Sequence, residues 1–177
     1  EVKVEKDAQE NCLHELFNLY YCTHPCIIDL YNWEFYEKNN ELFMSLFMEY
    51  TDNNLKKYIS SRPENATFED DCIIAYGLLA GVKHMHNLSI IHRDIKIENV
   101  VVFYNERESY YYPKIIDFGT SEQHGTKTKA RTRIYECHSL ANYPEEPDLF
   151  ASCLVLLSVL GKQLPKVLDD NDTWNEA

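Results

Sequence analysis

The sequence predicts an α+β fold in which strands dominate the beginning of the chain and helices dominate the rest. Alternating apolar residues before residue 50 indicate strands, whereas apolar residues at helical spacing later in the chain indicate helices. A β-rich seam at residues 100–104 and 114–116 separates the helical segments. Strands first and helices afterwards are typical of an α+β domain with two lobes.

The first part of the chain contains the expected strands and one helix. Val2 and Val4 alternate with charged neighbours, as in a strand, and residues 8–21 have a helical composition. Apolar runs at 27–36 and 42–50 flank the turn-like sequence EKNN, which predicts an antiparallel pair. The expected core face of the helix consists of Leu13, Leu16, Phe17, Tyr20 and Tyr21.

Two further helices are expected before the seam. Residues 52–61 form the shorter one, which ends before Pro63 because a residue that precedes proline disfavours helical geometry. Residues 67–86 form the longer one, in which Thr67 and Asp70 resemble a capping box. Its expected buried stripe consists of Cys72, Ala75, Tyr76, Leu79 and Val82.

The segments around and after the seam follow from their composition. A polar, tyrosine-rich link at 105–113 joins the two strands of the seam. Residues 120–138 lack periodicity, which predicts a loop, and residues 148–160 are apolar enough for a buried helix. The tail after Pro165 is acidic and is expected to be mobile.

Charge and cysteine content exclude several classes of function. A net charge of -12 on 177 residues argues against binding to nucleic acid or to an anionic membrane, since such binding depends on basic surface. No apolar run reaches the roughly 20 residues that span a bilayer, so we expect a cytoplasmic location, with the nucleus as the alternative. The 6 cysteines form no CxxC pair, and buried reduced thiols are expected. Zinc binding by Cys22, His24 and Cys26 is the disfavoured alternative, because no second ligand cluster accompanies them.

Polar residues suited to phosphate chemistry lie in two short segments. Residues 91–99 read IHRDIKIEN, and residues 115–119 read IIDFG. Phosphoryl transfer needs a carboxylate near the attacking hydroxyl and oxygen ligands for Mg²⁺. Asp94, Asn99 and Asp117 offer these groups, although each of them alone is equally typical of a solvated loop.

Together, HRDIKIEN and IIDFG resemble the catalytic loop and the metal-binding loop of the eukaryotic protein kinases, in the order and separation of that family. The resemblance implies that Asp94 is the catalytic base and that Asn99 and Asp117 bind Mg²⁺. It implies that Lys96 contacts the transferred phosphate, as in the serine/threonine kinases. ATP and Mg²⁺ are therefore the expected cofactors, and a protein with a Ser or Thr hydroxyl is the expected substrate.

The resemblance also implies a nucleotide site. Glu15, counted back from His24 and Pro25, falls at the family's helix glutamate and is expected to pair with Lys3 in EVKVEK. Lys6 is the alternative partner, and two solvated lysines on an edge strand are the simpler interpretation. The expected adenine site consists of Met48, Glu49 and Tyr50 as gatekeeper and hinge, flanked by Leu55 and Val101. The expected hydrophobic spine consists of Leu19, Leu30, His92 and Phe118.

Residues after Gly119 resemble the family's activation loop. Thr132 and Tyr135 match its substrate-docking positions, and Thr128 matches the activating phosphorylation site. A phosphate on Thr128 would add up to about two negative charges, which Arg93 is expected to receive. An exposed threonine in a basic loop is the alternative interpretation.

Two further acidic residues match functional positions of the family. Asp148 resembles the buried helix aspartate that holds the backbone of the catalytic loop. Glu98 stands where basophilic kinases often contact an arginine of the peptide. A basic peptide is therefore the expected kind of substrate.

The chain also departs from the family's pattern. Its first glycine is Gly77, so the family's glycine-rich phosphate loop is not present. Cys137, His138 and Ser139 stand where the family has Ala-Pro-Glu. These departures favour a pseudokinase-like binding or regulatory module, which is the alternative to an active ATP-dependent serine/threonine kinase.

The expected domain organisation is a kinase domain truncated at both ends. Residues 1–50 correspond to a remnant of the small β-rich lobe, from its third strand onward. Residues 51–177 correspond to the mainly helical lobe up to about its buried central helix, followed by the acidic tail. We expect missing segments or a partner to cover the apolar surface that such a chain would leave exposed.

Overall fold

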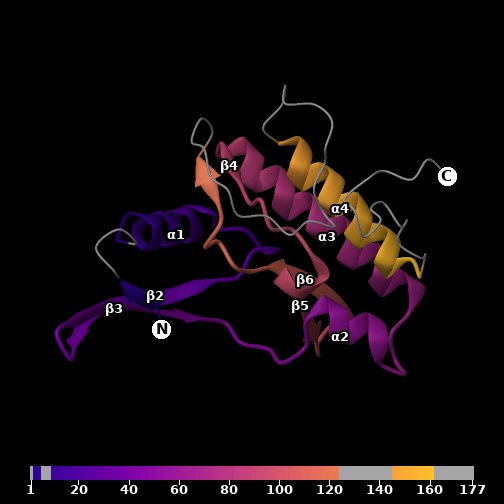
Figure 1. Ribbon diagram of the computed structural model, residues 1–177. Helices are drawn as coiled ribbons and strands as arrows, with labels where there is room; N and C mark the ends of the chain where they lie inside the picture. Colours follow the sequence, from indigo (N-terminus) through magenta and orange to yellow (C-terminus); the bar gives the residue numbers. More distant parts are fainter. Residues whose placement is uncertain (1, 5–8, 124–144, 162–177) are drawn as a thin grey trace, which may run out of the picture.

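The computed structural model (Figure 1) describes residues 2–4, 9–123 and 145–161, with side chains at 12–121 and 145–161. A three-stranded antiparallel sheet forms its amino-terminal part. Its strands are β1 (Val2–Val4), β2 (Leu30–Lys38) and β3 (Glu41–Met48), in the order β1-β3-β2. β2 and β3 form the expected antiparallel hairpin. Asn39 and Asn40 turn the chain with φ of 56° and 60°, a left-handed conformation that asparagine tolerates well.

The helix α1 (Gln9–Tyr21) lies against one face of this sheet (Figure 1). Cys12 and Leu16 of α1 pack on Met44 of β3 in a small buried cluster. The ring of Tyr20 meets the ring of Trp33 edge-on, with centroids 5.5 Å apart. α1 and the sheet therefore form one packed layer pair, separate from the main core.

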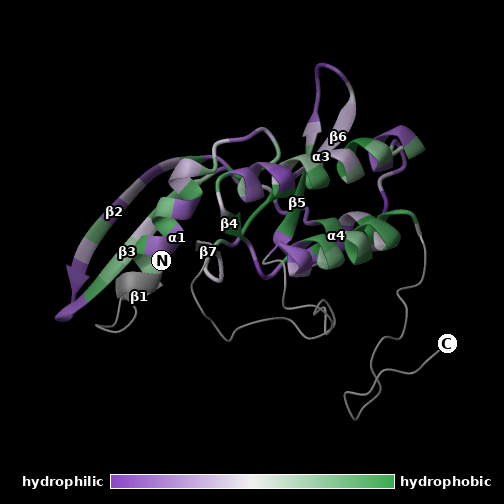
Figure 2. Cartoon of the chain, turned by 90° about the horizontal axis from the view of Figure 1, so that it is seen from above, coloured by the Kyte–Doolittle hydropathy of each residue, from purple (hydrophilic) through white to green (hydrophobic). Residues whose placement is uncertain are grey.

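Three helices form the second part of the molecule, as the sequence predicts. α2 (Leu55–Ser60) begins at the cap residue Asn54, whose side chain accepts a hydrogen bond from the backbone of Lys57. α3 (Phe68–Asn87) begins with the predicted capping box of Thr67 and Asp70. α4 (Glu146–Val159) packs beside α3 and is hydrophobic along most of its length (Figures 1 and 2).

Short strands connect the two parts. β4 (Ile90–Ile91) pairs with β7 (Glu122–Gln123), and β5 (Val100–Asn105) pairs with β6 (Tyr110–Ile115). A 3₁₀ turn, η1 (Ile97–Asn99), leads into β5. Two expectations were wrong here. The link at 105–113 is shorter than expected because Tyr110–Pro113 belong to β6, and the loop expected from residue 120 contains β7.

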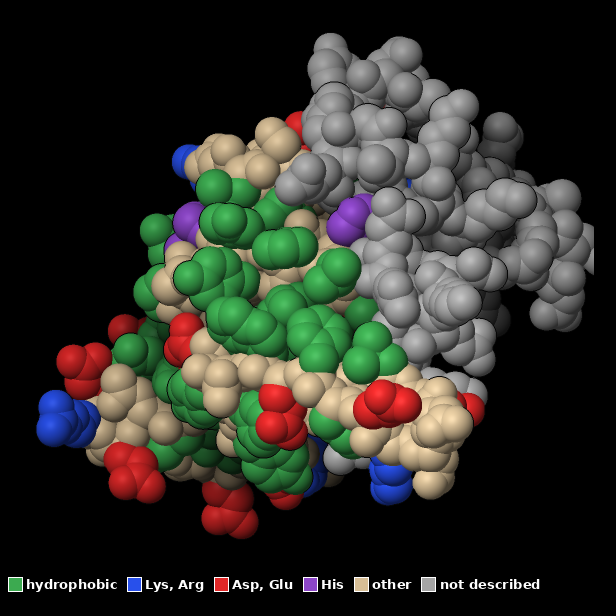
Figure 3. All heavy atoms as spheres, turned by 90° about the vertical axis from the view of Figure 1, so that its left-hand side faces the viewer, with side chains coloured by type: hydrophobic (Ala, Val, Ile, Leu, Met, Phe, Trp, Pro, Cys, Tyr) green, Lys and Arg blue, Asp and Glu red, His purple; other side chains and the backbone are tan. Residues whose placement is uncertain are grey.

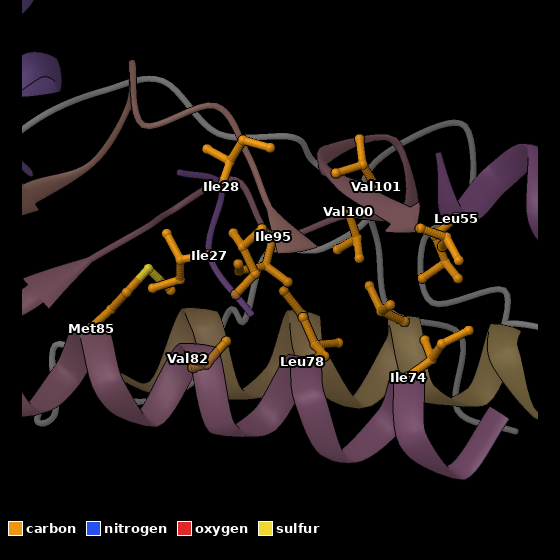
Figure 4. Close-up of a cluster of buried hydrophobic side chains, with 14 of the residues drawn as sticks. Ile27, Ile28, Leu55, Ile74, Leu78, Val82, Met85, Ile95, Val100 and Val101 are labelled. Atoms are coloured by element: carbon orange, nitrogen blue, oxygen red, sulfur yellow. The ribbon is translucent and has the colours of Figure 1, made fainter. Parts of the chain in front are cut away.

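The main core lies between α3 and the strands β5 and β6. In Figure 4, Ile74, Leu78, Val82 and Met85 point from α3 toward the side chains of the strand layer. The ring of Pro113 on β6 lies directly over Gly77 of α3. The mixed α+β class expected from the sequence is therefore confirmed.

The buried faces of α1 and α3 differ from the expected ones. On α1, Leu16 is buried, but Leu13, Phe17, Tyr20 and Tyr21 are between 39% and 64% exposed. The buried residues of that helix are Cys12, Leu16, Asn18 and Leu19. On α3, Val82 is buried as expected, whereas Cys72, Tyr76 and Leu79 are exposed. Apolar residues surround much of each helix, so spacing alone does not indicate which face meets a neighbour.

Exposed hydrophobic side chains gather over α1 and β2. Figure 3 shows this face, on which hydrophobic side chains form a broad group. The most exposed members on α1 and β2 are Phe17, Tyr20, Tyr21, Tyr31, Trp33 and Phe35. Of the cysteines in the described part, Cys12 and Cys22 are buried and free as expected, whereas the free thiols of Cys72 and Cys153 are exposed. No helix in that part is both long and apolar enough to cross a membrane.

Candidate active site

The segment between β4 and β5, residues 92–99, carries the predicted catalytic residues, and we call it the catalytic segment. His92, Asp94 and Lys96 follow β4, and Asn99 ends η1 directly before β5. Arg93 has φ of 69° in this segment. Left-handed backbone at a residue other than glycine costs free energy and is concentrated at functional sites. The surrounding contacts must therefore hold this segment in place.

Asp94 is the centre of these contacts. It is only 8% exposed, and its Oδ2 accepts hydrogen bonds from the Lys96 ammonium and, at 2.8 Å, from Nδ2 of Asn99. The same Nδ2 donates to the Asp94 carbonyl at 3.0 Å. Because both of these Asp94 atoms are acceptors, the amide of Asn99 turns its nitrogen toward Asp94 and its oxygen away from it.

Asp148 of α4 holds the backbone before Asp94. Its carboxylate accepts hydrogen bonds from the backbone amides of His92 (2.7 Å) and Arg93 (2.8 Å) and lies 2.9 Å from Nε2 of His86. Burial raises the pKa of Asp148, but these hydrogen bonds and the nearby His92 outweigh it and lower the pKa below its usual value. The predicted role of Asp148 in holding this loop agrees with the contacts.

Asp117 lies beside Glu15 of α1. Asp117 has φ of 68°, and the amide of Gly119 donates to its Oδ1 at 3.4 Å. A Cβ placed on Gly119 would lie 3.4 Å from that oxygen and 3.6 Å from Oε2 of Glu15, so the two carboxylates face the same glycine. Burial raises the pKa of Glu15, and the negative charge of Asp117 raises it further.

A cavity of about 360 Å³ opens between the two parts of the molecule. Its volume lies within the range of roughly 300–1,000 Å³ that is usual for small-molecule sites. Its lining consists of Glu15, Leu19, Ile28, Met48, Glu49, Tyr50, Thr51, Val101, Ile116, Asp117 and Phe118. Six of the residues predicted for nucleotide or metal binding therefore share one cavity: Glu15, Met48, Glu49, Tyr50, Val101 and Asp117.

Leu55 does not belong to this lining, contrary to the expectation that it flanks adenine. Its side chain is fully buried in the main core, at the start of α2 (Figure 4). Val101, which pairs with the neighbouring Asn54 in an isolated bridge, does line the cavity. The helix turns Leu55 inward because its apolar side chain completes the core beneath β5.

Several predicted site residues fall outside the described parts. The backbone of Lys3 pairs with Phe43 in the sheet, but its side chain is among those not described, as is all of Lys6, so the pair with Glu15 stays a prediction. Thr128, Thr132 and Tyr135 lie outside the described residues, as do residues 137–139 and the acidic tail. The phosphorylation switch at Thr128 therefore also stays a prediction.

The predicted hydrophobic spine is partly assembled. Leu19 and Phe118 are buried in the main core, and Leu30 is half-buried beside it. The ring of His92 meets the ring of Phe118 at 5.2 Å between centroids. Phe118 therefore connects the cavity lining to the catalytic segment.

Glu98 already has a partner in this structure. Its Oε1 accepts a hydrogen bond at 3.0 Å from Nζ of Lys56 on α2, in a pair whose side chains are 40% and 61% exposed. Exposed ion pairs are weak, so Lys56 holds Glu98 only loosely. Within the described residues, no group of three or more His, Cys, Asp or Glu side chains could hold a metal ion.

Sequence reasoning missed an ion cluster that includes the cavity residue Glu49. Nζ of Lys114 on β6 lies 2.8 Å from Oδ2 of Asp29 and 2.5 Å from Oε1 of Glu49. Lys114 is 5% exposed. The one signal in the sequence was a lysine inside the short apolar run before IIDFG, where a charge is unusual unless it is paired.

Comparisons with known proteins relate the chain to protein kinases. Residues 1–176 match the protein kinase domain family. Calcium-dependent protein kinase 4 of Plasmodium falciparum is 31% identical over 173 residues, which cover 94% of this chain and 32% of that protein. Stress-activated protein kinase JNK of Drosophila melanogaster is 30% identical, over 86% of this chain and 42% of that protein. Cyclin-dependent kinase G-1 of Oryza sativa subsp. indica is 29% identical, over 75% of this chain and 19% of that protein.

These matches identify the family. The chain belongs to the protein kinase domain family, because the match to that family extends over nearly its whole length. It spans between 19% and 42% of the length of these three relatives. What the relatives act on is therefore no guide by itself to what this chain acts on.

Proposed function

We propose that this chain carries the catalytic centre of a serine/threonine protein kinase, which transfers the γ-phosphate of ATP to a Ser or Thr hydroxyl of a protein. The observation that carries the proposal is the buried Asp94 carboxylate, which Asn99 and Lys96 hold, in a segment next to the strand that lines the cavity. A carboxylate in such a position can accept the proton of an attacking hydroxyl.

The chain's own residues would divide the work as follows. Asp94 orients the substrate hydroxyl and accepts its proton. Lys96, whose ammonium lies beside Asp94, neutralises charge on the oxygens of the transferred phosphate. Val101, Met48 and the backbone of Glu49 and Tyr50 enclose the base of the nucleotide in the cavity. Glu15 would orient Lys3 toward the phosphates if that predicted pair forms.

The donor set at Asn99 and Asp117 fits a magnesium ion. Mg²⁺ prefers hard oxygen ligands and usually takes only one or two from the protein. The side-chain amide of Asn99 turns its oxygen away from Asp94. The backbone amide of Ile116 donates to the backbone carbonyl of Asn99 at 3.0 Å, and Asp117 is the next residue after Ile116. When bound, the ion would neutralise charge on the phosphates.

The regulatory alternative is supported by the second of the two departures described above, at residues 137–139. Cys137, His138 and Ser139 replace the residues by which the family anchors its substrate-docking segment. A protein of this kind could bind a nucleotide or a partner with little turnover. Under either function, we propose residues 1–50 and 51–177 as the two lobes, a cytoplasmic or nuclear location and a basic peptide as the partner.

Replacing Asp94 tests the proposal. The full-length protein that contains this chain is assayed for transfer of labelled γ-phosphate from ATP to Ser and Thr peptides with basic flanks. Asp94→Asn keeps the shape of the side chain but removes its basicity, and Asp94→Ala removes both. Both variants should lower kcat by at least ~100-fold, because a positioned base contributes about that much or more.

The matched control is Glu106→Ala, an exposed carboxylate in the turn between β5 and β6. It should leave transfer unchanged, and all variants should bind a fluorescent ATP analogue as the wild type does. Wild-type transfer equal to that of both Asp94 variants would favour the regulatory module. If the wild type does not bind the analogue, the kinase function is rejected, and so is a regulatory module that binds a nucleotide.

A further inference from the structure

The Lys114 cluster joins three segments that are distant in the sequence. Asp29 lies between α1 and β2, Glu49 follows β3, and Lys114 lies in β6. The partners are 85 and 65 residues away from Lys114 along the chain. Asp29 and Glu49 also bond to each other, through Glu49 N to Asp29 O at 3.2 Å and Asp29 N to Glu49 Oε1 at 3.3 Å.

The cluster adjoins the cavity through Glu49. Glu49 lines the cavity between Met48 and Tyr50. Val101 on β5 also lines the cavity, and it is the cross-strand partner of Lys114. One ammonium group therefore connects the wall formed by Met48–Tyr50 to the strand pair that carries Val101.

The position of Asp29 is held by backbone contacts as well. The amide of Ile28 donates to the Ile115 carbonyl at 3.0 Å, and the amide of Ile115 donates to the Cys26 carbonyl at 2.9 Å. The segment before β2 thus runs along β6 as an additional strand would. It presents Asp29 to Lys114 on a backbone that cannot shift without breaking these bonds.

The charges in the cluster depend on one another. Burial opposes the charge on Lys114, but the hydrogen bonds and negative charges of Asp29 and Glu49 outweigh it and raise the pKa of the ammonium. Burial raises the pKa of Glu49, and the adjacent Asp29 raises it further. Loss of the Lys114 cation would leave these two carboxylates close together without compensation, which is unfavourable because the Glu49 side chain is only 12% exposed.

We propose that Lys114 is a positioning residue for the nucleotide: through Asp29 and Glu49 it holds the Met48–Tyr50 wall at a set distance from Val101 and so sets the affinity for the adenine end of ATP. This inference rests on the proposed function. It assigns Lys114 no part in the transfer step, because its ammonium bonds to Asp29 and Glu49 and not to Asp94 or Asp117. The affinity arises from a preformed cavity, which lowers the cost of ordering the wall on binding.

The test measures binding and turnover separately. The dissociation constant of a fluorescent ATP analogue is measured for the full-length wild type, Lys114→Gln and Lys114→Arg, together with KM for ATP and kcat. Lys114→Gln should bind about tenfold more weakly, with KM raised and kcat within about twofold of wild type. Lys114→Arg keeps the charge and can donate to both carboxylates, so it should stay within about threefold of wild type.

Lys83→Gln is the matched control, because Lys83 is exposed on α3. It should bind the analogue as the wild type does. If Lys114→Gln does not fold, Asp29→Asn replaces it, since the Asp29 side chain is 47% exposed and its loss loosens only one arm of the cluster. Asp29→Asn should bind about threefold more weakly.

The outcomes separate this inference from the proposed function. A wild type that binds no analogue rejects the nucleotide site itself. If the wild type binds the analogue and Lys114→Gln or Asp29→Asn binds it with equal or higher affinity, this inference is overturned while the proposed function stands. A loss of thermal stability in Lys114→Gln without any change in binding would show a purely structural role and would also overturn it.

Discussion

The imidazole of His92 determines how the backbone enters the catalytic segment. Nε2 lies 3.0 Å from the Ile116 carbonyl, and Nδ1 lies 3.3 Å from the backbone nitrogen of Asp94. A carbonyl can only accept and an amide can only donate, so Nε2 must carry the proton and Nδ1 must be bare. The neutral ring is therefore part of what holds Asp94 in position.

Protonation of His92 should weaken the fold. Burial lowers the pKa of His92 below 6.5, although the charge of Asp148 partly opposes this. As the pH falls below about 6.5, the unfolded chain binds a proton that the folded chain resists, so the stability contributed at neutral pH is lost progressively. The free energy of unfolding in urea should therefore decrease from pH 7 to pH 5.

His92→Gln removes this titration and should flatten that part of the pH dependence. The exposed His14→Gln is the matched control and should follow the wild-type curve. An NMR titration of the His92 ring should give a midpoint below pH 6.5. A midpoint at or above 6.5 would contradict the assigned proton positions.

At the scale of elements, α3 shows how a neighbour selects the buried face of a helix. Gly77 and Gly81 have no side chains, and this allows Pro113 and Ile115 of β6 to approach the helix closely. The face that carries these glycines is buried together with Ile74 and Leu78, whereas Tyr76 on another face is 77% exposed. Small residues at the contact, rather than large ones, indicate where α3 meets β6.

Gly77→Ala should destabilise the protein even though alanine favours helices. A Cβ on Gly77 would lie 2.7 Å from Cγ and 2.8 Å from Cδ of Pro113, whose ring cannot rotate away. Overpacking of this kind costs about 1–3 kcal/mol, against a gain of about 1 kcal/mol in helix propensity. We expect a net decrease in the free energy of unfolding, measured in urea.

Tyr76→Ala is the control for this substitution, because Tyr76 is 77% exposed on the same helix. Its free energy of unfolding should stay within about 0.5 kcal/mol of wild type. A Gly77→Ala protein as stable as wild type, or more stable, would mean that β6 can move away from α3.

At the scale of the whole molecule, Asp148 connects α4 to α3 and to the catalytic segment. Its carboxylate is fully buried and contacts His86 on α3 as well as the amides of His92 and Arg93. Hydrogen bonds to a buried charge are stronger than neutral ones and costly to lose. The orientation of the catalytic segment therefore depends on the packing of two helices.

Asp148→Asn should lower both stability and activity. The amide keeps the shape but can no longer accept from both backbone amides, so the free energy of unfolding should fall by about 1–3 kcal/mol. Phosphate transfer should fall with it, because Arg93 and Asp94 lose their support. Urea unfolding and the transfer assay measure the two effects.

The pH dependence of the wild type provides a second check on Asp148. Its pKa is lowered below 3.8, so its contribution is present at neutral pH and is lost as the pH falls from 3.8 through the lower folded value. Asp148→Asn should therefore show a smaller loss of stability in acid than wild type. Equal acid dependence in the two proteins would argue against the charged state of Asp148.

Much of this organisation could be predicted from the sequence. The capping box at Thr67 and Asp70, the hairpin at Asn39 and Asn40, and the cluster of Asp94 and Asn99 all depend on residues close together in the chain. Local geometry decides such features, because the partners are only a few residues apart. The role of Asp148 was predicted from the family resemblance, since its partner His92 lies 56 residues away.

The buried faces and the Lys114 cluster could not be predicted in this way. Leu55 turns into the core and Tyr76 faces solvent because of the surfaces that pack against their helices, which the spacing of apolar residues does not specify. Asp29 and Lys114 meet across 85 residues, where no local pattern links them.

The sequence by itself determined the family and most of the elements, and it predicted the residues of the catalytic segment, because each is encoded in short stretches of chain. Only the tertiary structure decided that Glu15, Val101 and Asp117 share a cavity and that Lys114 supports its wall. The reason is physical: burial and ion pairing depend on which surfaces meet, and the folded chain brings distant surfaces together to exclude water.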